Sequence, residues 1–242
     1  MLQSPSARAL LEAWERGLEQ GPVERGLTLL ALTRPGDDPE SLAALSVGDR
    51  DRHLLALREA LFGTRMTGLV TCGSCGERLE LEFATGELRG AAPDQAVLTV
   101  RGADHELQLR LPDSRDLLAI AAAGTEDGAA LLLERCLVSA RIGGDDARGG
   151  RLPAALVAEA GRRLADADPL ADLRFALTCP ACGFDWAAPF DIVGYLWAEI
   201  EGWAGRLLSE VHELASAYGW SEAEILALNP IRRRSYLRMV GA

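Results

Sequence analysis

The sequence contains no lysine, so all 25 of its basic side chains are arginine. Without lysine there is no P-loop phosphate-binding lysine, no Schiff-base lysine and no kinase-type ATP lysine, which excludes three large enzyme classes. Aromatic residues make up only 5% of the chain, and asparagine occurs once, at Asn229. No apolar run approaches the roughly 20 residues that a membrane helix requires, and the start, MLQSPSARAL, lacks a basic region followed by an apolar core. We therefore expect a cytoplasmic protein that makes no membrane contact.

The charge is strongly one-sided. The 36 acidic residues outnumber the arginines and give a net charge of −11 and a pI near 4.8. Such a surface repels nucleic acid and anionic membranes at long range, so nucleic acid is a disfavoured partner. The composition of the whole chain, 48% apolar and 25% charged over 242 residues, is that of an ordinary globular protein with one or two packed cores.

Hydrophobic periodicity predicts an α+β fold that is mostly helical, in three regions. Residues 1–65 form an N-terminal helical region that starts with Ser4 as N-cap and Pro5 in the first turn. Residues 66–190 alternate between strand and helix patterns, and residues 191–242 return to helix. A long C-terminal helix is expected over 191–218, with Trp203 and Tyr218 on its buried stripe.

Within these regions the patterns predict individual elements. Strands are expected at 79–83, 97–101, 106–111, 173–177 and 184–188, and helices at 114–123, 126–141 and 153–167. Residues 102–104 are expected to turn, and the Gly/Asp-rich segment 143–150 to form a surface loop. Ser221 with Glu224 predicts a capping box, and Asn229 before Pro230 predicts another helix start.

Two segments of the chain repeat one another around paired cysteines. TCGSCGERLELEF at 71–83 aligns with TCPACGFDWAAPF at 178–190, each as strand, Cys-x-x-Cys-Gly, strand. Two thiolates three residues apart on a tight turn can reach one tetrahedral ion, and the following glycine can adopt the left-handed conformation that points amides at sulfur. We therefore predict a structural Zn²⁺ in a discontinuous Cys₄ zinc ribbon, built from two knuckle hairpins at 66–92 and 172–190 with strands and helices inserted between them. The predicted ligands are Cys72, Cys75, Cys179 and Cys182.

Other uses of these cysteines fit less well. A thioredoxin-like dithiol needs a helix that begins at the motif, whereas both copies continue as strand. Catalytic zinc needs an open coordination position, which four thiolates do not leave. Cys136 lies in an apolar helical pattern and is predicted to be a small buried residue. Removing the metal is expected to loosen or unfold the whole protein.

No catalytic constellation is present, so we expect no enzymatic activity and no small-molecule substrate. The three histidines, His53, His105 and His212, have unrelated surroundings, and position 216 is Ser216 where a zincin would carry its second histidine. The sequence also lacks a Gly-x-Ser-x-Gly elbow and a Gly-x-Gly-x-x-Gly fingerprint.

The C-terminal quarter concentrates aromatic and basic side chains. Tryptophan and tyrosine gather there, and aromatic rings of this kind often anchor interfaces, although on an amphipathic helix they are as often core. Segment 229–242 holds four arginines and no acid, which suits an acidic protein partner or, as an alternative, RNA, while the macrodipole alone would also favour cations at a helix end. The predicted partner-binding residues are Trp197, Trp220, Arg232, Arg233, Arg234, Tyr236 and Arg238.

Several strings together resemble a known family. They are GDRDRHLLALREALFG before CGSCG, LPDSRDLLAIAA, CPACGFDW and the ending EVHELASAYGWSEAEILALNPIRRRSYLRMV, over residues 27–240. The chain resembles phage baseplate-type proteins, which are encoded with phage tails and with the contractile injection systems of bacteria, and it would be a zinc-ribbon-bearing member. The resemblance implies a structural or assembly role in the baseplate, with other baseplate or tail proteins as partners and possible incorporation in a tail-like particle. The alternative is a zinc-ribbon adaptor that binds RNA or the transcription machinery.

Overall fold

A computed structural model describes residues 4–88, 90, 97–102, 104–124, 127–147 and 152–241 of the chain. The fold is α+β with helices predominating and a long C-terminal helix, as the sequence predicts. Parts of several predicted features lie outside the described residues: position 103 of the expected turn, the expected helix start at 126, and 148–150 of the Gly/Asp loop.

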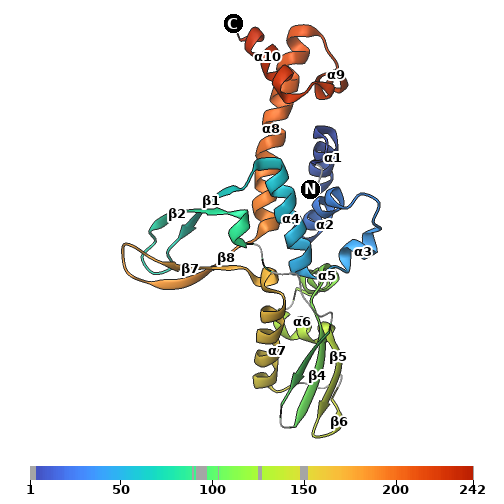
Figure 1. Ribbon diagram of the computed structural model, residues 1–242, viewed down its shortest axis with the longest axis vertical. Helices are drawn as coiled ribbons and strands as arrows, with labels where there is room; N and C mark the ends of the chain where they lie inside the picture. Colours follow the sequence, from blue (N-terminus) through green and yellow to red (C-terminus); the bar gives the residue numbers. More distant parts are fainter. Residues whose placement is uncertain are drawn as a thin grey trace.

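The long helix α8 is the axis of the molecule (Figure 1). It spans Ile192–Tyr218, and Asp191 caps it by accepting a hydrogen bond from the Val193 amide. Its first half packs against the N-terminal helices, and together they enclose the largest hydrophobic core, which includes Leu29, Leu54 and Ile200. The N-terminal helices are α1 (Ala7–Gly17), α2 (Pro22–Thr33), α3 (Pro39–Ala43) and α4 (Val47–Phe62).

The predicted start of the first helix is wrong by two residues. Ser6, not Ser4, is the N-cap of α1, because its side chain accepts the Ala9 amide while its own backbone is extended. Pro5 therefore precedes the helix. The Ser4 hydroxyl instead donates to the carbonyl of Ala60 at the end of α4, which links the chain start to the helical body.

Two antiparallel hairpins project together from one side of α8 (Figure 1). The first pairs β1 (Arg65–Thr71) with β2 (Arg78–Ala84), and the second pairs β7 (Arg174–Thr178) with β8 (Asp185–Pro189). Each hairpin is a separate two-stranded sheet, so no strand pairing among the described residues joins them. We call these two hairpins the arm. Short 3₁₀ turns, η1 (Thr85–Leu88) and η2 (Pro169–Asp172), connect the arm to the rest of the chain.

The chain between the hairpins forms a unit with its own core. A four-stranded sheet has the order β3-β4-β5-β6, and Leu107, Leu109 and Leu133 are buried in a second hydrophobic cluster beneath it. We call this unit the insert. Its strands are β3 (Val97–Arg101), β4 (His105–Arg110), β5 (Leu137–Ile142) and β6 (Asp145–Asp146), and its helices are α5 (Ser114–Ala123), α6 (Gly128–Cys136) and α7 (Ala154–Ala167).

The structure corrects two predictions in the insert. The helix expected over 126–141 ends at Cys136, because Leu137 is extended and starts β5, which pairs with β4. The Gly/Asp segment is not wholly a loop: Gly143 and Gly144, both with positive φ, turn the chain so that β6 pairs with β5.

Hydrogen bonds hold the insert against the helical body. The buried Asp168, which ends α7, accepts the Gly48 amide in the first turn of α4. A Cβ added at Gly48 would meet the Asp168 carboxylate at 1.8 Å, so only glycine allows this contact. The Val47 amide also donates to the carbonyl of Pro112.

The last helices fold back on the far end of α8. Both predicted caps are confirmed: Ser221 and Glu224 form the capping box of α9 (Glu222–Ala227), and Asn229 caps α10 (Pro230–Val240). Tyr218 is 39% exposed, so its predicted burial is wrong. Its ring stacks at the surface on Trp220.

No helix among the described residues combines the length and apolarity needed to cross a membrane.

Candidate metal centre

Each hairpin of the arm ends in a tight turn that carries one cysteine pair. In the first turn the Cys72 amide donates to the carbonyl of Glu77, and the Gly76 amide donates back to the carbonyl of Cys72. The second turn repeats this pattern through Cys179, Phe184 and Gly183. The prediction of left-handed glycines is confirmed, since φ is +79° at Gly76 and +72° at Gly183.

The two turns bring the four sulfur atoms together. The Sγ atoms of Cys72 and Cys182 lie 3.8 Å apart, and those of Cys75 and Cys179 lie 3.6 Å apart. All four Sγ atoms are within 4.8 Å of one another, and none forms a disulfide. Four thiolates around one tetrahedral ion with bonds of about 2.3 Å have sulfurs about 3.8 Å apart. The four predicted ligands could therefore hold a single metal ion.

The cluster has a buried and an exposed side. Cys72 and Cys179 are each 1% exposed, whereas Cys75 and Cys182 are open to solvent. Backbone amides of Cys75 and Ser74 donate to the Cys72 sulfur and lower its pKa to about 7.

Cys75 shows the opposite pKa shift. The Glu77 amide favours its thiolate, but the neighbouring sulfurs of Cys182, Cys179 and Cys72 outweigh that effect and raise the pKa of Cys75 to about 12. Adjacent thiolates repel one another, and a divalent cation is the group that relieves this repulsion.

The base of the arm is closed by aromatic rings rather than by sulfur. Phe83 of β2 and Phe175 of β7 have ring centroids 4.8 Å apart, and Phe190 packs edge-on against both at 5.6 Å. Tyr195 of α8 packs on Phe190 at 5.7 Å. The hairpins are thus joined by aromatic contacts next to the helical core and by the cysteine cluster at their tips.

An ion pair supports the same end of α8. The buried Arg58 of α4 donates to both carboxylate oxygens of Glu199, at 2.9 and 2.7 Å, and to the carbonyl of Gly63. The Glu199 hydrogen bonds raise the pKa of Arg58, which therefore stays charged. Its guanidinium lies 5.7 Å from the Tyr195 ring centroid, so the helical body and the base of the arm share this contact.

The structure divides the predicted partner-binding residues into buried and exposed ones. Trp197 is 5% exposed, packs over Gly17 and carries the Arg25 guanidinium 4.5 Å above its ring, so this burial contradicts its predicted role in partner binding. The reason is that α1 and α2 cover this face of α8. Arg233 is also buried and donates to Glu210 at 2.6 Å.

The remaining partner-binding candidates gather around α10. Trp220 and Tyr236 are half-buried, with ring centroids 4.8 Å apart. Arg232, Arg234 and Arg238 are exposed and make no ion pair with a described acidic residue. Their recorded side-chain contacts are local, from Arg234 to the carbonyl of Pro230 and from Arg238 to the Ser235 hydroxyl.

Cys136 and the histidines add nothing to the metal centre. Cys136 is fully buried, as predicted, and burial raises the pKa of its thiol to about 12. His53 contacts the carbonyl of Asp49 in its own helix, and His105 lies beside Asp104 in the insert.

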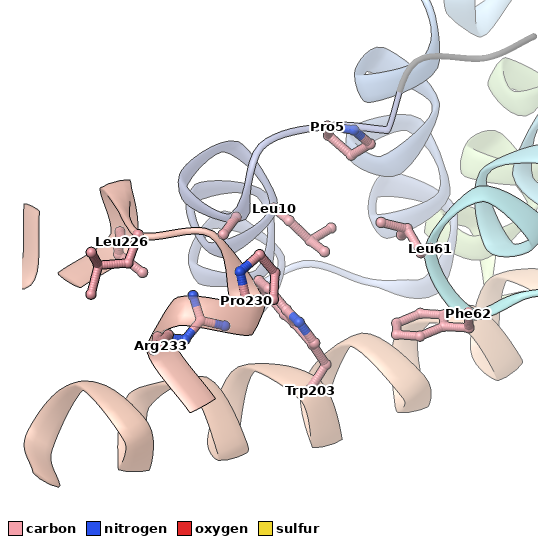
Figure 2. Close-up of a pocket in the computed structure, with 10 residues that line it drawn as sticks. Pro5, Leu10, Leu61, Phe62, Trp203, Leu226, Pro230 and Arg233 are labelled. Atoms are coloured by element: carbon pink, nitrogen blue, oxygen red, sulfur yellow. The ribbon is translucent and has the colours of Figure 1, made fainter. Parts of the chain in front are cut away.

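Two features of the structure were not predicted from the sequence. One is the buried carboxylate Asp116, which receives hydrogen bonds from Arg110 and Arg135. The other is an apolar pocket of about 270 Å³ between α1, α4, α8, α9 and α10, shown in Figure 2. Its walls come from five elements, so no local pattern could signal it.

No family model, curated protein or solved structure matches this chain.

Proposed function

We propose that this protein is a structural or assembly component of the baseplate of a phage-tail-like contractile injection system, and that it acts by binding other baseplate or tail proteins around a structural zinc ion. The support is the four-cysteine cluster together with the resemblance of the sequence to baseplate-type proteins. The cluster supports a structural rather than a catalytic metal, because four thiolates occupy all four positions of a tetrahedral ion and leave none for a substrate.

Zinc is a metal whose preferred tetrahedral thiolate chemistry fits four cysteine ligands at these distances. Bound by Cys72, Cys75, Cys179 and Cys182, it would cross-link the two turns of the arm and complete a discontinuous zinc ribbon. Elemental analysis of freshly purified, reduced protein should give one equivalent of zinc. Less than half an equivalent would overturn the assignment.

The baseplate role is tested in the organism that encodes the chain. Tagged protein should co-sediment with particles that contain sheath and tube subunits, or co-purify with one baseplate subunit. Particles and subunits recovered without the tagged protein, after growth conditions that produce them, would overturn the role.

The RNA or transcription adaptor remains the second candidate because Arg232 and Arg234 are exposed on α10 without a described acidic partner. It predicts nucleic acid that co-purifies at low salt, leaves at high salt and is lost when both arginines are replaced by alanine. Arg233 is kept in this variant because it is buried against Glu210. Purified protein free of nucleic acid at low salt would exclude the adaptor.

A further inference from the structure

The pocket in Figure 2 combines apolar walls with one buried guanidinium. Trp203 projects from α8, with Pro230 and Arg233 on one side and Leu61 and Phe62 on the other. The Arg233 side chain is only 10% exposed. Of its lining residues Pro230 is exposed, whereas most of the others, including Trp203, are half-buried.

The Arg233 guanidinium has donors left over. Its Nε donates to Glu210 at 2.6 Å, and this is its one side-chain hydrogen bond among the described residues. A guanidinium carries five N–H donors, so four remain for other acceptors. The two terminal nitrogens therefore suit an acceptor that enters the pocket.

The electrostatics around the pocket favour an anionic acceptor. Pro230 and Arg233 belong to the first turn of α10, which is the positive end of that helix's dipole. The neighbouring Arg232 and Arg234 add two exposed charges, and described residues 229–241 include no acid. A carboxylate here would gain charge-assisted hydrogen bonds.

The size and walls of the pocket define the rest of the occupant. Its volume of about 270 Å³ is below the range of about 300–1,000 Å³ typical of sites that enclose a drug-sized ligand. It suits one or two apolar side chains between Trp203, Leu226 and Phe62. Aromatic and arginine side chains in a partly desolvated pocket are also the usual anchors of protein interfaces.

We propose that this pocket is a docking site for a partner-protein segment in which an apolar side chain is flanked by a carboxylate. The apolar side chain packs on Trp203, and the carboxylate accepts hydrogen bonds from the Arg233 terminal nitrogens. This proposal rests on the proposed assembly function in one respect only, namely that the occupant is a protein. The contacts of Arg233 and Trp203 carry the rest.

The test uses full-length protein labelled with 5-fluorotryptophan, in which Trp203→Phe identifies the Trp203 signal in the ¹⁹F NMR spectrum. The probes are the peptides acetyl-Glu-Leu-Leu-Glu-amide and acetyl-Gln-Leu-Leu-Gln-amide. The acidic peptide should shift the Trp203 signal saturably and bind about tenfold more tightly than the amide peptide, which corresponds to about 1.4 kcal/mol. No shift, or equal binding of both peptides, would overturn the proposal.

Variants separate recognition from folding. Arg233→Met should abolish the preference for the acidic peptide, while Arg163→Met, which removes an exposed arginine of α7 away from the pocket, should leave it unchanged. Glu210→Gln should tighten binding of the acidic peptide several-fold, because it removes the competing charge at Arg233. This gain keeps the test decisive if Arg233→Met fails to fold, and unchanged or weaker binding by Glu210→Gln would contradict the proposal.

Two further outcomes are informative. A uridine oligonucleotide that moves the Trp203 signal in an Arg233-dependent way would overturn the protein segment as occupant. Peptide binding in a protein that never associates with particles would overturn only the baseplate role, and particle association without peptide binding would overturn only the pocket.

Discussion

The Tyr195 hydroxyl pairs with both backbone groups of Thr67. It accepts the Thr67 amide at 3.1 Å and donates to the Thr67 carbonyl at 3.0 Å. A side chain of α8 thus takes the place of a neighbouring strand at β1 and fixes where the first hairpin leaves the helical body.

Replacing Tyr195 by phenylalanine should weaken this attachment while keeping the ring contact with Phe190. Two lost hydrogen bonds at a partly exposed site should lower the free energy of unfolding by about 1–2 kcal/mol, and the Thr67 amide should exchange faster with deuterium. Tyr236→Phe is the matched control, since the Tyr236 hydroxyl makes no recorded hydrogen bond within the described chain. Equal exchange at Thr67 in the wild type and Tyr195→Phe would contradict the role.

Metal removal should act first on the arm. The sequence led us to expect that the whole protein loosens, but the core around α8 contains no cysteine, so the structure narrows this prediction. A ligand at roughly 1,000 times its Kd stabilises by about 4 kcal/mol, or about 8–16 °C in Tm for a chain of this size. Chelation under reducing conditions should therefore lower Tm and speed hydrogen exchange in β1, β2, β7 and β8, and added zinc should reverse both effects. Unchanged exchange in the arm would contradict a structural metal.

Alanine at Gly76 should weaken metal binding, because φ there is +79° and a Cβ strains that conformation by about 1–2 kcal/mol. Gly73→Ala is the matched control in the same turn, since Gly73 lacks a positive φ and has open space where a Cβ would be placed. Competition with a chromophoric chelator should show weaker zinc affinity for Gly76→Ala only. Equal affinities would show that the left-handed turn is dispensable.

Asp116 should make the insert sensitive to acid. Burial alone would raise the pKa of Asp116, but the hydrogen bonds from Arg110, the Asp113 amide and Arg135 outweigh it and hold the pKa below its usual value. A lowered folded-state pKa means that the stability is present at neutral pH and is lost as the pH falls below about 4. Asp116→Asn should be less stable by about 3 kcal/mol at pH 7, and its deficit should shrink in acid.

The measurement for Asp116 is denaturant unfolding at several pH values, with exchange rates in β3 to β5 as the local readout. Asp166→Asn on α7 removes an exposed carboxylate and serves as control. A deficit for Asp116→Asn that is independent of pH would contradict the ionic role.

Local signals explain what the sequence could predict. The cysteine turns and the caps at Ser221 and Asn229 are each specified within six residues or fewer, and each forms as expected. None of these turns and caps needs a distant residue to define its backbone conformation. Only the four-cysteine cluster needs the second hairpin, which supplies its other two sulfur atoms.

Tertiary contacts decided the features that the sequence missed. The segment after Cys136 reads equally well as helix or strand, and pairing of Leu137 through Ile142 with β4 selects the strand. Trp197 could not be placed because an amphipathic pattern does not say whether a second layer of helices covers that face. Asp116 and the pocket depend in the same way on side chains that meet only in the folded chain.

The two halves of the cysteine cluster are separated by the whole insert, and this imposes an order on synthesis. A ribosome adds about 5–20 residues per second, so Cys72 and Cys75 emerge roughly 5–20 s before Cys179 and Cys182. During that interval the insert, which has its own hydrophobic cluster, can fold while the first turn holds half a metal site. Closure of the arm is therefore a late event, and capture of an ion by all four cysteines would require that the polypeptide has been made at least as far as its second turn.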